Sequence, residues 1–405
     1  MTKYGTSPVS KQDVASRSEE LKSRTGADTG SSSKLGRVCS SRAVQVAIGA
    51  SIVLVFLSLG LYRLVLHDRP EAYDIAGYLL EANRLGEFGG VTAFPKMVAK
   101  GQWFQANQHP LYILAITPFA EFDFDFMVSA KLVNLFFGAL SVLVGFVIAS
   151  RYFTPFIATL GVTGFALTQQ NIMWSTLVAC EGLLILLSIL TMTAIMKGFQ
   201  DRRYWIMAGF LAGVAYLTKV TALLLLPAFF LAVLLKFRSR VFRIRELYLF
   251  VATFLLAASP LLISNTILHG NPIYNVNIDN LSDKHAGVAY QESSIEKGSM
   301  IRVYKDAPDG DSSSTGIGIG PGNVVKLSAG VFRRLPGEFT LLLETLSPWP
   351  LHTSPRYFRW VLGLGILGLF LVGVLREPSS GARNYVLLTV AVFLLADRKS
   401  TRLNS

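Results

Sequence analysis

The stretch DRPEAYDIAGYLLEANRLGEFGG, residues 68–90, determines how the rest of the chain is interpreted. It follows the first long apolar run, where a membrane chain would leave the bilayer, and it is rich in acidic side chains. Asp68 and Glu71 have the spacing of a capping box, and the glycines between Gly86 and Gly90 are typical of a helix end. The stretch therefore predicts a short helix at the membrane surface.

One face of this predicted helix carries the first candidate for chemistry. Asp74, Tyr78 and Ala82 share that face, because residues four apart in a helix lie one above the other. Acidic side chains at this external face suit a site that handles a charged lipid headgroup, and Asp74 is our strongest candidate for a catalytic residue. The alternative interpretation is a juxtamembrane helix that simply exposes its acids to water.

The composition predicts an all-α membrane protein. The 405 residues are 51% hydrophobic and 16% charged, and their mean hydropathy is +0.45, which excludes an ordinary soluble enzyme. Several apolar runs approach the roughly 20 residues that a membrane-spanning helix needs. Nine candidate spans can be drawn, at about 43–66, 127–150, 152–170, 176–196, 204–218, 220–236, 247–264, 357–375 and 384–396.

The net charge of +12 arises largely from basic clusters beside these runs. The positive-inside rule predicts such clusters on the cytoplasmic side, so we expect no nucleic acid as a partner. The clusters are Lys197, Arg202 and Arg203, followed by Lys236, Arg238, Arg240, Arg243 and Arg245. Residues 1–42 are rich in Ser, Gly and Thr, with more basic than acidic side chains, and we expect a disordered cytoplasmic tail.

The segment HPLYILAITPFA, residues 109–120, is too short for a full span, and we expect it to be re-entrant or interfacial. Seven crossings then precede Asn265, and both basic clusters face the cytoplasm. If the segment did cross, every later span would be inverted. The predicted membrane domain is therefore 43–396, with a first external loop at 67–126 and a long external loop at 265–357.

The last residues of the chain do not continue the pattern of a membrane span. The last apolar run stops at Ala396 and is followed by DRKSTRLNS, residues 397–405. This ending resembles the translated sequencing-adapter tails of truncated reading frames. We expect these residues to be non-native and the natural protein to be longer.

Four more residues are candidates for a site at the external face. Glu181 lies inside an apolar run, where a carboxylate is costly and points to function or to a buried pairing. Lys219 lies at the turn between two apolar runs and could instead extend to lipid phosphates. His109 is either a ligand or an interfacial residue, and Asn265 lies before a Gly/Pro sequence that also fits a simple turn.

In their order these residues resemble the GT-C class of lipid-linked sugar transferases, specifically the protein O-mannosyltransferases and the lipid A aminoarabinose transferases. The resemblance covers roughly residues 43–274. Its motifs are Asp74-x3-Tyr78-x3-Ala82, HPLY from His109 to Tyr112, Glu181, the segment GFLAGVAYLTK from Gly209 to Lys219, and Asn265-x4-Gly270-x-Pro272. The chain departs from the family at Ile75, where a second acid is common, and at Leu111, which replaces the second proline of a His-Pro-Pro motif.

The resemblance implies a GT-C-like helical bundle that transfers a sugar from a polyprenyl-phosphate donor to an acceptor at the external face. Asp74 would be the base and Lys219 would stabilise the departing phosphate. His109 and Asn265 would contact the headgroup, and Tyr78 would orient the helix that carries the base. A single displacement by the acceptor predicts inversion at the anomeric carbon.

The same resemblance leaves other points open. Glu181 would position the sugar or hold a divalent ion, and no other cofactor is implied. The setting would be the lipid bilayer of a bacterial inner membrane, with a cytoplasmic N-terminus. Two alternatives are a transporter or flippase of lipid-linked intermediates, which expects internal repeats and polar residues at mid-membrane, and a non-catalytic partner in glycan assembly.

Overall fold

The structure is a computed structural model that describes residues 42–66, 73–103, 110–120, 125–273 and 380–396. The regular elements in these ranges are helices, and no strand occurs among them, which confirms the predicted all-α membrane protein. Five helical stretches are long and apolar enough to cross a membrane: α3 (Arg42–Leu66), α7 (Phe126–Tyr152), α10 (Glu181–Gly198), the stretch Val220–Arg243 and α13 (Arg245–His269).

The stretch Val220–Arg243 consists of η3 (Val220–Leu224), α12 (Leu225–Phe237) and η4 (Arg238–Arg243). The remaining bundle elements are shorter: α8 (Pro155–Ala166), α9 (Gln169–Ser175), α11 (Arg203–Tyr216) and α18 (Ser380–Ala396). Two predicted boundaries differ from the observed ones. The run 152–170 is divided after Ala166 into α8 and α9, and the run predicted to start at Thr176 becomes helical only at Glu181.

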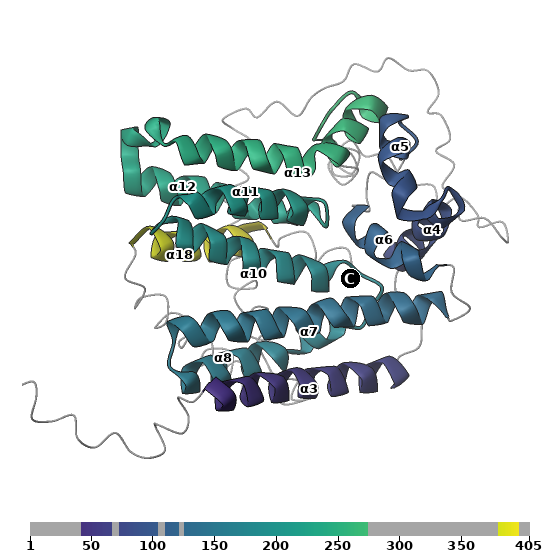
Figure 1. Cartoon of the computed structure of the whole chain (residues 1–405), viewed down its shortest axis with the longest axis horizontal. Helices are drawn as coiled ribbons and strands as arrows, with labels where there is room; N and C mark the ends of the chain where they lie inside the picture. The colour runs from purple at the N-terminus through teal and green to yellow at the C-terminus, as the bar shows by residue number, and fades with distance from the viewer. Residues whose placement is uncertain (1–41, 67–72, 104–109, 121–124, 274–379, 397–405) are drawn as a thin grey trace, which may run out of the picture.

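The bundle helices run side by side, each roughly antiparallel to the one before it (Figure 1). Helices α3, α7, α10, α11 and α13 pack in that order, while α12 and α18 pack on each other and α8 with α9 covers α3 and α7. This arrangement gives the bundle two chemically different ends. We call the end with the turns after α10 and α12 the basic end, and the opposite end, where α10 begins, the α4 end.

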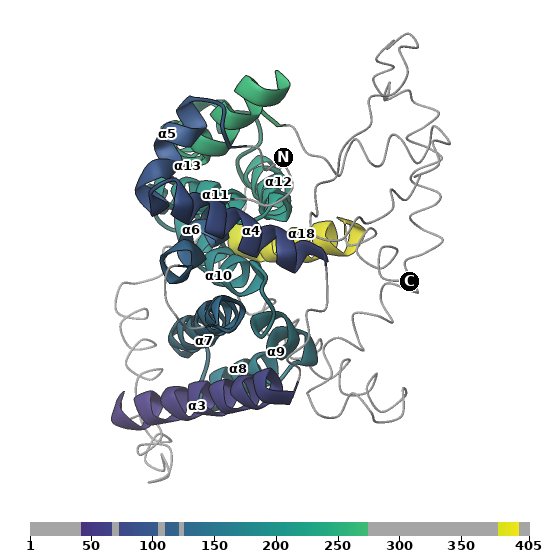
Figure 2. The same cartoon turned by 90° about the vertical axis from the view of Figure 1, so that its right-hand side faces the viewer.

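Short elements lie across the α4 end (Figure 2). They are α4 (Tyr73–Glu87), η1 (Gly90–Ala93), α5 (Phe94–Ala99), α6 (Pro110–Ile116) and η2 (Thr117–Phe119). Helix α4 ends before Gly89 and Gly90, whose φ angles of 106° and 73° favour glycine, so the predicted helix end is confirmed. The predicted cap at Asp68 lies outside the described residues. In α6 the Leu111 N–H donates to the Leu217 carbonyl oxygen at 3.0 Å, which fixes α6 to the turn after α11.

Several sequence predictions concern residues that the structure does not describe. They include almost all of the 1–42 tail, the external loop beyond residue 273, the apolar run 357–375 and the ending 397–405. Within the described ranges, both predicted basic clusters lie at the end opposite Glu181 and Lys219. Which end faces the cytoplasm stays a prediction.

Helices α11 and α13 approach closely because glycine lines their contact. A methyl group added to Gly209 would overlap the backbone carbonyl of Phe250, and one added to Gly213 would overlap that of Phe254. Small residues four apart are a common way for membrane helices to pack backbone against backbone. This contact fixes α11, and Lys219 lies in the turn that follows α11.

We expect Gly209→Ala to destabilise the bundle by about 1–3 kcal/mol, because backbone atoms of α13 cannot move aside as a side chain would. Thermal unfolding of the purified protein in detergent measures the effect. Gly145→Ala in α7 is the matched control, since no atom lies within 4 Å of its added methyl group. An equal loss of thermal stability in both variants would contradict the proposed close contact.

Candidate functional site

The centre of the candidate site is an ion pair between α10 and the turn after α11. The Lys219 Nζ lies 2.5 Å from the Glu181 Oε1, and the two side chains are 39% and 18% exposed. Glu181 is the first residue of α10, where the helix dipole favours a carboxylate. Lys219 precedes η3 in an extended conformation, with φ −162° and ψ 140°. The structure thus brings together two residues that the sequence singled out separately.

The second carboxylate oxygen of Glu181 is not used by the ion pair. Glu181 Oε2 is buried and has no hydrogen-bond partner among the described residues. Buried polar atoms in proteins are almost always hydrogen-bonded, and an exception calls for a physical explanation. This oxygen is suited to accept a hydrogen bond from a hydroxyl group or to bind a cation.

Helix α4 reaches the same place through Tyr78. The Tyr78 hydroxyl donates to the Cys180 Sγ at 3.2 Å, and its ring meets the Tyr112 ring edge to face with centroids 5.2 Å apart. Tyr112 is itself fixed by donating to the Ala130 carbonyl oxygen at 2.9 Å. Tyr78 and Ala82 are buried, as expected for residues on one face of α4.

Asp74 lies in the first turn of α4, and its side chain lies outside the described residues. Its backbone is one helical turn before Tyr78, which corresponds to about 6 Å along the axis. Because Tyr78 contacts the residue next to Glu181, this geometry places the Asp74 backbone at the same end of the bundle as the ion pair. Its role as a base stays a prediction.

Asn134 on α7 fixes the point at which α10 begins. Its Oδ1 accepts a hydrogen bond from the Gly182 N–H at 3.0 Å, while its Nδ2 donates to the carbonyl oxygens of Trp174 and Leu177 at 2.6 and 3.0 Å. A side chain of α7 therefore holds the segment between α9 and α10 in place by hydrogen bonds to its backbone. This explains why the apolar sequence before Glu181 does not extend α10 further back.

The sequence interpretation missed Asn134 and its neighbour Lys131. Lys131 lies one turn before Asn134 on α7 and is only 1% exposed. A usable signal was present, since two polar residues three apart interrupt an otherwise apolar run and must share a helix face. An intramembrane lysine also carries the same functional expectation as Glu181.

Of the other two predicted site residues, the structure describes Asn265 but not His109. Asn265 is buried on α13, and its Nδ2 donates to the Pro272 carbonyl oxygen at 3.3 Å across a turn in which Gly270 has φ 66°. This contact fits a Gly/Pro turn, and headgroup binding by Asn265 stays a prediction. His109 lies outside the described residues. Among described residues, no group of three or more His, Cys, Asp and Glu side chains is arranged to hold a metal ion.

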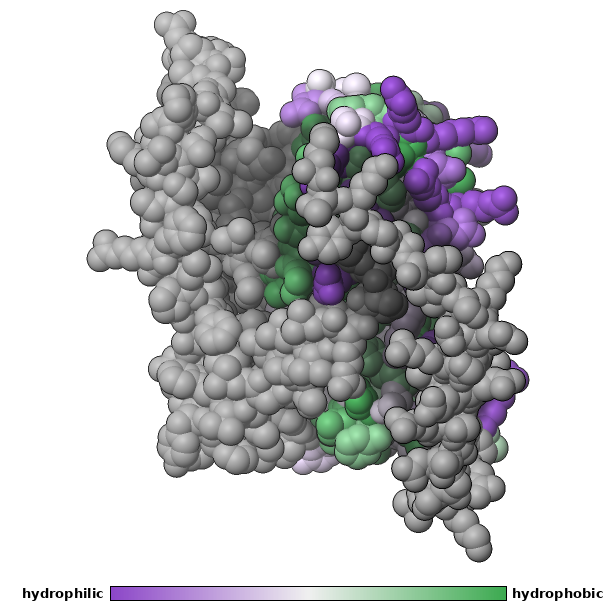
Figure 3. All heavy atoms as spheres, turned by 90° about the vertical axis from the view of Figure 1, so that its left-hand side faces the viewer, coloured by the Kyte–Doolittle hydropathy of each residue, from purple (hydrophilic) through white to green (hydrophobic). Residues whose placement is uncertain are grey.

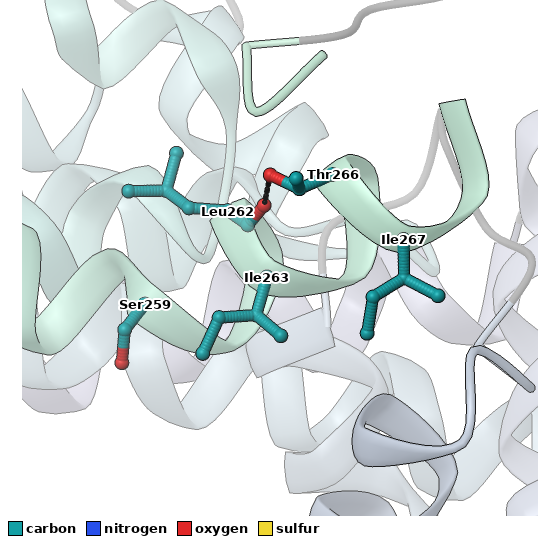
Figure 4. Close-up of a pocket in the computed structure, with 5 residues that line it drawn as sticks. All are labelled: Ser259, Leu262, Ile263, Thr266 and Ile267. Atoms are coloured by element: carbon teal, nitrogen blue, oxygen red, sulfur yellow. Dashed lines mark hydrogen bonds between the residues drawn. The ribbon is translucent and has the colours of Figure 1, made fainter. Parts of the chain in front are cut away.

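A shallow hollow lies on one side of α13 (Figure 4). The Thr266 hydroxyl at its rim donates to the Leu262 carbonyl oxygen at 2.7 Å, which leaves a mainly apolar lining. The hollow is lined by Ser259, Leu262, Ile263, Thr266 and Ile267, and it contains none of the predicted site residues. Its chemistry suits hydrocarbon better than a polar reaction.

The fold and the ion pair at the end of its bundle define an all-α membrane protein with a polar site at one end. Residues 109–263 match the family model described as dolichyl-phosphate-mannose-protein mannosyltransferase. This segment is less than half of the chain, and it contains Glu181 and Lys219 but neither Asp74 nor Asn265. The match confirms the resemblance to this family, which is a family of membrane glycosyltransferases, over that segment of the chain. No curated protein and no solved structure matches the chain.

We expect Asn134→Ala to lower the free energy of unfolding by about 2 kcal/mol or more, because it leaves one N–H and two carbonyl groups without their partner. Thermal unfolding in detergent measures this loss. Ser141→Ala is the control on the same helix, since the buried Ser141 hydroxyl bonds only within α7, to the Gly138 carbonyl oxygen at 2.7 Å. If both variants lost equally little stability, Asn134 would not be the residue that fixes the start of α10.

Proposed function

We propose that the protein transfers a sugar from a polyprenyl-phosphate donor to an acceptor hydroxyl at the external face of a membrane, in the manner of the family that its central segment matches. The observation that carries this proposal is the Glu181–Lys219 ion pair beside the docking point of α4. A charged, partly buried pair at a membrane surface suits a phosphate-bearing lipid, whose tail remains in the bilayer.

Lys219 would stabilise the departing phosphate. An ammonium group has three N–H donors, so it can bind Glu181 and a phosphate oxygen at the same time. The carboxylate of Glu181 holds the ammonium group in place before the donor arrives. Because the pair is partly buried, its charge acts more strongly on a developing phosphate than a fully exposed lysine would.

Asp74 would act as the general base for the acceptor. A sugar phosphate leaves readily, so the demanding step is removal of the acceptor's proton as the oxygen attacks the anomeric carbon. One displacement at that carbon inverts its configuration. Tyr78 supports this arrangement by fixing α4 to Cys180, next to Glu181, and His109 and Asn265 would lie nearer the headgroup.

Glu181 Oε2 would accept a hydrogen bond from a hydroxyl of the transferred sugar. Its burial without a partner among the described residues supports an acceptor role, and the unfilled oxygen also fits a divalent ion as the second possibility. The two possibilities are separable, since transfer that survives a strong chelator requires no exchangeable ion at this carboxylate. The setting would be a bacterial inner membrane, with the basic end and the N-terminus in the cytoplasm.

Asp74→Asn tests the proposed base. In proteoliposomes supplied with polyprenyl-phosphate sugar donors and an acceptor-containing membrane extract, we expect transfer to fall by about 10²- to 10⁴-fold, since the amide cannot accept the proton. Glu87→Gln, which removes an exposed acid from the end of the same helix, should retain full transfer. Full transfer by Asp74→Asn would refute the assignment, and donor translocation without transfer would favour the flippase alternative.

A pair of variants separates catalysis from stability at the ion pair. Lys219→Met should abolish most transfer and also lower thermal stability, because it leaves the Glu181 carboxylate unpaired in a poorly solvated place. Lys219→Met combined with Glu181→Gln removes both charges and should recover stability without recovering transfer. Transfer that returned together with stability would show that Lys219 acts only as a structural partner.

A further inference from the structure

The basic end of the bundle carries a concentrated positive surface. Figure 3 looks onto this end and shows hydrophilic side chains gathered over the turns of α11, α12 and α13, beside apolar surface. The basic residues that contribute are Lys197, Arg202, Arg203, Lys236, Arg238, Arg240, Arg243 and Arg245, all exposed except the half-buried Lys197. The same turns hold only two acids, Asp201 and Glu246, and the Asp201 carboxylate accepts from the Arg203 N–H at 3.1 Å.

Two of these cations are held in fixed places by aromatic rings. The Arg202 guanidinium lies 5.0 Å from the centroid of the Phe237 ring, and the Lys236 Nζ lies 5.5 Å from the same ring. Lys236 also lies 5.2 Å from the Phe199 ring centroid, and it donates to the Phe199 carbonyl oxygen at 3.2 Å. Two like charges therefore contact the same aromatic ring.

Neither cation forms an ion pair with a carboxylate in the parts of the chain that the structure describes. Like charges held near each other repel, and an anion bound by both relieves that repulsion. The Arg202 fork and the Lys236 point charge are the two side-chain types best suited to phosphate. The geometry thus favours one phosphate group shared by the two side chains.

The arginine-rich turn beside this pair is fixed rather than loosely attached. Arg238 has φ 50° and ψ −132°, an unfavourable backbone conformation for a residue with a side chain, which persists only where the surroundings impose it. Val241, three residues later, is buried in the core and anchors η4 to the bundle. The turn therefore presents its charges on a defined backbone.

Apolar surface directly beside the cations indicates the kind of partner. Phe242 and Tyr248 are 75% and 58% exposed, and Leu235 next to Lys236 is 55% exposed. These side chains belong to the ends of helices that are apolar enough to cross a membrane. A soluble anion would meet the charges alone, whereas a phospholipid brings a phosphate to the cations and acyl chains to the apolar flank.

We propose that Arg202 and Lys236, held over Phe237, form a binding site for the phosphate of an anionic phospholipid in the leaflet at the basic end. The site is at the opposite end of the bundle from Glu181 and Lys219, and it is independent of the proposed sugar transfer. The proposed site differs from the positive-inside pattern, because two particular side chains bind the lipid and not the total positive charge of the basic end.

Binding of phosphatidylglycerol to the full chain in detergent tests this site, with native mass spectrometry and thermal shift as readouts and phosphatidylcholine as the uncharged reference. Arg202→Gln with Lys236→Gln should weaken phosphatidylglycerol binding by about thirtyfold, since each cation near an anionic headgroup adds roughly 1 kcal/mol. The matched control is Arg42→Gln with Arg151→Gln, which removes two exposed charges from the same end but from other helices. The control should bind like the unmodified protein.

An equal loss of binding in both double variants would overturn the proposal, because diffuse charge would then explain the affinity. Equal binding of phosphatidylcholine would overturn it too. Inorganic phosphate that competed as well as the lipid would identify a site for a soluble anion instead. If the double variant does not fold, Arg202→Gln alone decides, since Arg202 is exposed and its removal leaves the Lys236 bond to Phe199 intact.

Discussion

The partial burial of a carboxylate at the first residue of α10 is the constraint on which the rest of the structure depends. Glu181 is stabilised by the helix dipole and by Lys219, and both must be in place because an unpaired charge there is costly. Lys219 reaches the Glu181 carboxylate only if α11 ends beside the first residue of α10. The glycines that let α11 pack against α13 therefore serve the ion pair as well as the core.

Three consecutive residues connect this pair to three different parts of the bundle. Cys180 accepts from Tyr78 of α4, Glu181 pairs with the turn after α11, and the Gly182 N–H donates to Asn134 of α7. Gly182 also admits this contact because a methyl group there would overlap backbone and side-chain oxygens of Asn134. The start of α10 is thus a junction, and a change in any one of these elements would displace the carboxylate.

The sequence predicted an all-α membrane protein and singled out both residues of the pair, because hydropathy and the cost of intramembrane charge are local signals. It did not predict where α10 starts, since that depends on Asn134, which is far away in the chain. Periodicity likewise could not divide the run 152–170 into α8 and α9. The Asn265 amide contacts a turn that follows its own helix, and the roles of Asn265, Asp74 and His109 stay predictions.

The two ends of the bundle use lysine in chemically different ways. At the α4 end Lys219 is neutralised by a carboxylate, so a ligand that binds there must act on an existing pair and can be positioned by it. At the basic end Lys236 and Arg202 lie over aromatic rings, which hold a cation without neutralising it. A net positive charge remains at that end, and it favours an anion as a lasting partner. The first arrangement suits turnover of a phosphate lipid, whereas the second suits retention of one.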